Sequence, residues 1–296
     1  MDLDSFLVAV YVMVDDWWQN QEAPGARGPG RPAVLSVSEV LTLALLAQWP
    51  RWRSERDFWR FAHAHLRTYF PALGSQSQLN RRIRAAEPAL RALHAALAAL
   101  LAPPSDVYHV LDTTLIPAVV RVRACRHGLF AGQASFGRCV SKTEWGYGFK
   151  VALAVTPAGV VSAFGLAPAA CDERPIGDAL IAADGHDAYL ADKGYASVSW
   201  ERRWHDTYGA LVAATPTATT RRAWPEAACR WAAGQRQVVE QVIAQLKDLF
   251  ALERHRAKTL GGLLARVAAK ITAFTTGEWL NAQGGRPLRH LAGLLV

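Results

Sequence analysis

The spacing of apolar residues changes near residue 105. Before it, apolar positions recur at helical intervals over 36–49, 54–66 and 75–102, and the first of these runs opens with Ser and Glu residues in capping positions. The segment 21–33, just before this run, is too rich in Gly and Pro for a helix or a strand. We predict an all-helical region that ends in the Pro-containing stretch Leu101–Asp106.

Short β-type runs alternate with helical runs after that boundary. The apolar run Val107–Val119 predicts a strand, and 146–169 predicts a hairpin whose turn is Thr156–Gly159. The further expected elements are a helix at 173–183, a strand at 188–195, a helix at 197–209, a strand at 210–216 and a long helix from about Gln235 to Phe250. This order predicts a mixed α/β domain.

The amino-acid composition predicts a type of binding partner and a cellular compartment. The chain is 51% hydrophobic, and its net charge of +8 with a pI of about 9.6 favours a polyanionic partner. Its four cysteines lie far apart, which fits a reducing compartment. The N-terminus lacks the basic start of a signal peptide, and no apolar run approaches the roughly 20 residues that span a bilayer. We therefore expect a cytoplasmic, nucleoid-associated protein with no membrane partner.

Two aspartates stand where predicted strands run out. Asp112 follows Val110 and Leu111 in the first strand of the α/β region, and Asp192 follows the apolar residues of a later strand. Open α/β sheets bind ligands near such strand ends. An unpaired carboxylate in an apolar strand is costly to keep ionised, so Asp112 needs a partner. Taken singly, each aspartate is more simply a cap or an ion-pair partner.

A third acid lies on the long C-terminal helix. Arg236, Glu240 and Lys247 recur at spacings of four and seven, which places them near one helical stripe. The apolar residues expected to face the core are Val239, Val242, Ile243 and Leu246. From this pattern alone, an exposed helix face with a weak ion pair is an equally good explanation.

Together, Asp112, Asp192 and Glu240 would form an oxygen-only cluster. Such a cluster suits Mg²⁺ or Mn²⁺, and two of these ions about 4 Å apart can activate an attacking oxygen and stabilise a leaving oxygen on phosphorus. A bound cation would offset the desolvation of Asp112 and the mutual repulsion of the three acids. The cluster therefore predicts metal-dependent phosphoryl transfer.

These motifs resemble those of the DDE transposases of bacterial insertion sequences. The likeness covers roughly 107–281, and its motifs are LDTT, ADKGY and the series Arg236, Glu240, Lys247. The family's signature reads Tyr-Arg-Glu-Lys, but Ala233 stands at the Tyr position here. The resemblance implies a ribonuclease H-like mixed sheet flanked by helices, with Asp112, Asp192 and Glu240 as catalytic acids and metal ligands.

The same resemblance implies a transposase that binds the ends of its insertion sequence and catalyses metal-dependent strand cleavage and strand transfer. Its partners would be transposon-end DNA and target DNA, on which it would act as a homodimer or larger assembly. Arg236 and Lys247 would place DNA or the helix of the third acid. Lys193, next to the second aspartate, is also expected to contact DNA.

Arginines in the helical region predict a second DNA contact. Arg81, Arg82 and Arg84 lie on a helix that could enter a groove, and arginines between 51 and 60 are interleaved with Trp residues. A solvated Arg-rich helix is the simpler alternative. The basic segment 120–142 would clamp the strand being cut.

We therefore predict a helical N-terminal DNA-binding region at 1–105 and a ribonuclease H-like DDE catalytic domain at 106–296. Three alternatives stay open: a nuclease of the same fold such as a junction resolvase, a catalytically inactive or domesticated DNA-binding protein derived from a transposase, and a basic structural protein. Other acids and histidines have simpler explanations. We expect Asp172 to cap a helix, Asp184 and Asp187 to form a turn, and His127 and His186 to be exposed in loops.

Overall fold

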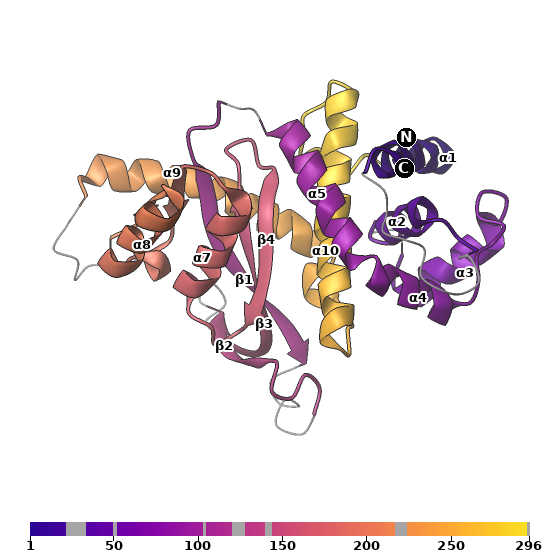
Figure 1. Ribbon diagram of the computed structural model, residues 1–296, viewed down its shortest axis with the longest axis horizontal. Helices are drawn as coiled ribbons and strands as arrows, with labels where there is room; N and C mark the ends of the chain where they lie inside the picture. The colour runs from indigo at the N-terminus through magenta and orange to yellow at the C-terminus, as the bar shows by residue number, and fades with distance from the viewer. Residues whose placement is uncertain are drawn as a thin grey trace. The chain divides into compact units, whose positions relative to one another are not determined.

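Two units make up the part of the chain that the computed structural model describes (Figure 1). The described residues are 1–21, 34–49, 52–102, 105–119, 128–139, 144–216 and 224–294. One unit combines Met1–Leu97 with Gly261–Val296, and the other is Ala98–Leu260. The C-terminal residues thus group with the N-terminal helices, while the assignment of 1–105 to DNA binding and 106–296 to catalysis stays a prediction.

Several predicted features lie outside the described residues. They are most of the Gly- and Pro-rich segment 21–33, residues 120–127 and 140–142 of the predicted clamp, Arg51 and His127.

Serine caps start several helices of the first unit. Its helices are α1 (Leu3–Gln19), α2 (Val37–Leu46), α3 (Glu55–His65), α4 (Gln76–Ala85), α5 (Glu87–Leu101) and α10 (Leu260–Gln283). The Ser36 side chain accepts a hydrogen bond from the backbone N–H of Glu39, whose carboxylate accepts one from the backbone N–H of Ser36. This capping box confirms the predicted start of α2.

Helix α10 supplies much of the core of this unit. Its side chains are buried on most faces between Gly262 and Asn281, as expected of a helix surrounded by others. The Thr272 hydroxyl donates to the backbone carbonyl of Leu90 on α5 at 3.0 Å.

The indoles of Trp52 and Trp59 each donate to a backbone carbonyl at 3.0 Å. These two rings are therefore engaged within the unit.

Strand β1 lies inside a six-stranded mixed sheet in the second unit. The strands are β1 (His109–Val119), β2 (Ser135–Cys139), β3 (Glu144–Val155), β4 (Val161–Pro168), β5 (Ala188–Ala191) and β6 (Leu211–Ala214). The order is β2-β3-β1-β5-β6, with β4 also paired to β3. Strand β1 runs antiparallel to β3 and parallel to β5, which confirms the predicted mixed α/β architecture.

The structure adds a strand to the predicted set. Strand β2 lies within the segment interpreted as a basic clamp, and it pairs with the first residues of β3 from Glu144 to Gly148. Strand β3 therefore begins before the expected hairpin start at residue 146.

Helices lie on both faces of this sheet. They are α7 (Glu173–Asp184), α8 (Val198–Tyr208) and α9 (Glu226–Asp248), with short 3-10 helices η1 (Lys193–Tyr195) and η2 (Leu252–Arg254). In Figure 1, α7 lies in front of the strands and α9 passes behind them. Adjacent residues of a strand point to opposite faces, so successive side chains of β1 face α7 and α9 in turn.

The helix boundaries in this unit follow local chemistry. The Asp172 side chain accepts from the backbone N–H of Arg174 at 2.9 Å, which confirms it as the cap of α7. Helix α9 begins at Glu226 and not near Gln235 as predicted, since the Ala-rich residues before Gln235 have high helix propensity and extend it. Among the described helices, none combines the length and the hydropathy that a membrane span requires.

Candidate active site

Asp112 lies on β1 immediately after the residues that pair with β5. The pairing of β1 with β5 places Leu111 opposite Ala191, so the next residues along these parallel strands are Asp112 and Asp192. The two carboxylates thus lie next to each other where β5 ends. This is the kind of position at which open α/β sheets bind ligands. Strand β1 continues past Asp112 to Val119 along β3, so the expectation that this strand runs out at Asp112 is wrong.

The guanidinium of Arg236 on α9 joins the two aspartates. Its Nη1 donates to Asp192 Oδ1 at 3.1 Å, and its Nη2 lies 3.9 Å from Asp112 Oδ2. The side chain of Arg236 is 16% exposed and that of Asp192 is 37% exposed, so the pairing is partly shielded from solvent. Its Nε is buried without a hydrogen-bond partner among the described residues.

Burial dominates the electrostatics of Asp112. It raises the pKa of the Asp112 carboxyl to about 6, and the charges of Asp192 and Glu173 act in the same direction. The Thr113 backbone N–H, which donates to Asp112 Oδ1 at 2.7 Å, and Arg236 both oppose this shift. Asp112 is therefore a carboxylate whose ionised form gains from a nearby cation.

Glu240 lies one helical turn after Arg236 and is exposed. No three described Asp, Glu, His or Cys residues are arranged to hold a metal ion. The structure therefore brings Asp112 and Asp192 together with Arg236, and it does not assemble Glu240 with them into a metal-binding group.

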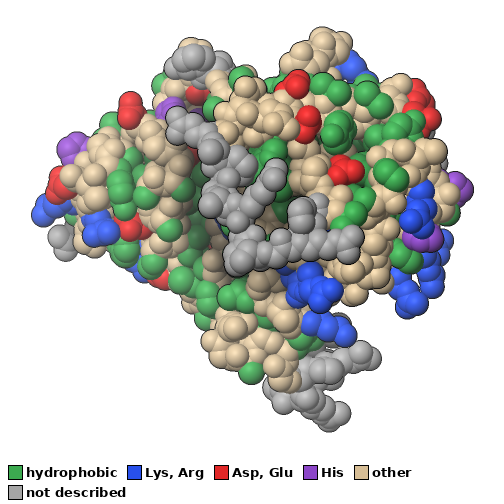
Figure 2. All heavy atoms as spheres, turned by 45° about the vertical axis from the view of Figure 1, so that its right-hand side comes forward, with side chains coloured by type: hydrophobic (Ala, Val, Ile, Leu, Met, Phe, Trp, Pro, Cys, Tyr) green, Lys and Arg blue, Asp and Glu red, His purple; other side chains and the backbone are tan. Residues whose placement is uncertain are grey.

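The predicted DNA-binding residues divide into paired and exposed side chains. Lys247 forms an ion pair with Glu253 of η2 at 2.9 Å, whereas Lys193 is exposed beside Asp192. On α4, Arg81 and Arg84 are exposed, but Arg82 donates to the backbone carbonyl of Leu35. Figure 2 shows Lys and Arg side chains in separate groups on the face it presents, with other side chains between them.

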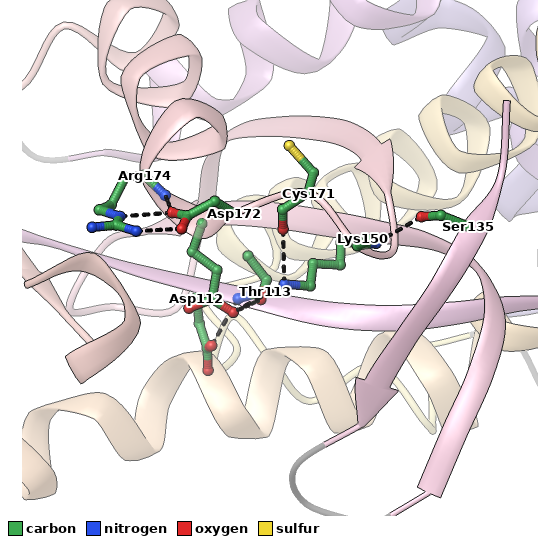
Figure 3. Close-up of polar contacts among 9 residues, drawn as sticks. Asp112, Thr113, Ser135, Lys150, Cys171, Asp172 and Arg174 are labelled. Carbon is green, nitrogen blue, oxygen red and sulfur yellow. Dashed lines mark hydrogen bonds and ion pairs between the residues drawn. The ribbon is translucent and has the colours of Figure 1, made fainter. Parts of the chain in front are cut away.

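Sequence reasoning missed Glu173, the first residue of α7. Its Oε1 accepts from the Thr113 hydroxyl at 2.9 Å and lies 3.4 Å from Lys150 Nζ. Lys150 also donates to the carbonyl of Cys171 at 3.2 Å, as Figure 3 shows. The signal that could have found this contact is Lys150 itself, a lone charge in the apolar run of β3.

Two of the competing residues, His186 and Asp184, contact His109 in the folded sheet. His186 is half-buried and stacks on His109 with ring centroids 4.0 Å apart, which corrects its interpretation as an exposed loop residue. Asp184 ends α7 and pairs with His109 Nδ1 at 2.6 Å. Gly185 follows it in the left-handed conformation, as expected of a turn before β5.

Comparison with known families decides what this arrangement is. A family model described as transposase DDE domain matches residues 104–260, slightly more than half of the chain. The chain belongs to the DDE transposases. The match contains the whole sheet, and the sheet and its helices have the strand and helix order of a ribonuclease H-like fold, as the sequence predicted. Searches of curated proteins and of solved structures gave no match.

Helix α9 carries Arg236, Glu240 and Lys247, the residues that the sequence analysis compared with the Tyr-Arg-Glu-Lys signature. Ala233, an exposed residue of α9, occupies the place of the Tyr. Because Ala has no ring or hydroxyl, no interaction of a tyrosine at this place can be made here.

Proposed function

We propose that this transposase binds the ends of its insertion sequence and catalyses divalent-metal-dependent strand cleavage and strand transfer, with Asp112, Asp192 and Glu240 as its acids. The observation that supports this most is the pair of aspartates that directly follow the paired segment of the parallel strands β1 and β5, where the guanidinium of Arg236 pairs with both. Cleavage and joining both transfer a phosphoryl group, for which two such carboxylates are suited.

The aspartates have the chemistry of Mg²⁺ or Mn²⁺ ligands. DDE transposases generally use divalent metals, and carboxylate oxygens are the ligands these hard cations prefer. A cation would also offset the desolvation that raises the pKa of Asp112. Asp112 and Asp192 would hold it, with Glu240 joining from α9. When bound, such a cation supplies charge stabilisation at phosphorus and activation of the attacking oxygen.

The residues around the two aspartates are proposed to have different roles in this reaction. The Thr113 N–H fixes one oxygen of Asp112, which leaves Oδ2 facing the α9 side of the site, where Arg236 lies. Arg236 pairs with both aspartates, and its guanidinium would be free to contact a DNA phosphate when a cation takes its place there. Lys193 and Lys247 are also proposed to contact DNA.

DNA-end binding is proposed for the helical N-terminal region. The side chains of Arg81 and Arg84 are exposed on α4 and would contact DNA directly. Arg82 donates to the backbone carbonyl of Leu35, so it would affect DNA binding only by stabilising the fold. Since two transposon ends must be held together, we propose a homodimer or larger assembly on DNA. Chromosomal DNA as substrate would make the protein nucleoid-associated.

The test uses the full chain and DNA that carries the ends of the element. Wild-type protein should nick these ends and join them to target DNA with Mg²⁺, and D112N should bind the ends but neither cut nor join. D206N removes an exposed carboxylate from α8 and is the matched control, which should retain activity. Nicking without joining would favour a nuclease, and end binding without cleavage would favour a domesticated DNA-binding protein.

A further inference from the structure

Glu173 touches the chain next to both aspartates. Its Oε1 accepts from the hydroxyl of Thr113, the residue after Asp112. Its Oε2 lies against Gly194, two residues after Asp192. We propose that Glu173 is a positioning residue of the transposase centre, whose carboxylate bridges the β1 strand and the turn after β5 and so fixes the spacing of the two aspartates. This inference rests on the proposed function.

Thr113 carries the bridge to the first aspartate. Its backbone N–H donates to Asp112 Oδ1 at 2.7 Å, and its hydroxyl donates to Glu173 Oε1 at 2.9 Å. One residue thus connects two carboxylates that come from opposite faces of β1. A shift of Glu173 would move Thr113 and, with it, the N–H that orients Asp112.

Gly194 carries the bridge to the second aspartate. A Cβ built on Gly194 would lie 1.9 Å from Glu173 Oε2, a separation that real atoms do not adopt. The left-handed backbone region does not explain this glycine, since Gly194 is not among the positive-φ glycines of the described residues. The glycine of the ADKGY motif therefore provides space for the Glu173 carboxylate.

Lys150 supports the carboxylate in this position. Lys150 Nζ, 3.4 Å from Oε1, balances its charge, while Arg174 is engaged with Asp172 and does not compete for it. Burial raises the pKa of Tyr195 well above its ordinary value, and the charges of Glu173, Asp112 and Asp192 raise it further. The three carboxylates therefore all disfavour ionisation of the buried Tyr195 hydroxyl.

Binding of Mn²⁺ to the full chain without DNA, measured by electron paramagnetic resonance, tests the proposal. E173A should weaken Mn²⁺ binding about tenfold, as loss of an outer supporting group does at other metal sites. G194A should do the same although it removes no charge, because its methyl group displaces the flexible end of Glu173. The double variant should bind no more weakly than E173A. D178N, which removes a carboxylate of α7 that pairs with Arg203, is the matched control and should bind as wild type does.

Wild-type Mn²⁺ affinity in E173A or G194A, or effects that multiply in the double variant, would overturn the proposal. If D112N abolishes cleavage while E173A changes neither cleavage nor metal binding, the proposed function stands and this inference fails. If wild-type protein neither binds Mn²⁺ nor cuts DNA, the proposed function fails. In that case thermal unfolding tests the contact between Thr113 and Glu173. T113V should lower Tm in the wild-type background but not in the E173A background. An equal decrease of Tm in both backgrounds would show that the two side chains do not interact.

Discussion

Arg236 Nη1 lies 3.1 Å from Asp192 Oδ1, and the same guanidinium pairs with Asp112 Oδ2 at 3.9 Å. Arg236 and Asp192 come from α9 and from the end of β5, far apart in the chain. One guanidinium carries a single positive charge, so it offsets only part of the charge that the two carboxylates carry when both are ionised. We propose that a divalent ion would replace this guanidinium at Asp192 Oδ1, to which Arg236 donates.

The raised pKa of Asp112 predicts a stability that depends on pH. The folded-state value of about 6 exceeds the ordinary value of 3.8, so the folded protein binds more protons between these pH values. Stability should fall as pH rises from about 4 to 6. D112N should lack this component and be more stable than wild type at pH 7 by about 1 to 3 kcal/mol. Urea unfolding at pH 4.5 and 7 measures the difference; a parallel pH dependence in both proteins would contradict the assignment.

Magnesium should stabilise the transposase through the same carboxylates. A ligand that binds only the folded state raises Tm, so Tm should increase with Mg²⁺ in the wild type and stay constant in D112N and D192N. Differential scanning fluorimetry with Mg²⁺, and with matched ionic strength from NaCl, measures this. Equal shifts in all three proteins would show that the ion acts elsewhere.

Substitution of the α4 arginines should affect either DNA binding or thermal stability, depending on the residue. R81A and R84A remove exposed charges, so Tm should hardly change while DNA-end binding weakens and the slope of its salt dependence falls by about one for each phosphate that is no longer neutralised. R82A removes the donor to the Leu35 carbonyl and should lower Tm. Fluorescence anisotropy at several salt concentrations, with thermal unfolding, distinguishes the two. Unchanged binding in R81A and R84A would exclude this face of α4 from DNA contact.

The parts of the fold that the sequence predicted correctly depend on residues that are close together in the chain. The capping box at Ser36 and the cap at Asp172 depend on residues a few positions apart, and the strands follow from their apolar runs. The proximity of Asp112 and Asp192 follows once β1 and β5 are parallel neighbours, since both residues come directly after the paired segment.

Contacts between distant residues could not be read from such patterns. Glu173 meets Thr113 across 60 residues, and no periodicity in either segment predicts that hydrogen bond. The burial of His186 depends on its stacking with His109, which only the folded sheet brings near. Helical spacing placed Glu240 correctly on the stripe of Arg236, but a stripe does not specify whether the side chain turns toward a site or toward solvent.

The most direct test is the joining of a precut transposon-end oligonucleotide, with a free 3′-hydroxyl, to plasmid DNA in Mg²⁺. The wild-type transposase should form the covalent product, and D112N, D192N and E240Q should each form none while still binding the oligonucleotide. Product formed without a divalent ion, or joining at the wild-type rate by any of these three variants, would contradict the assignment of this centre.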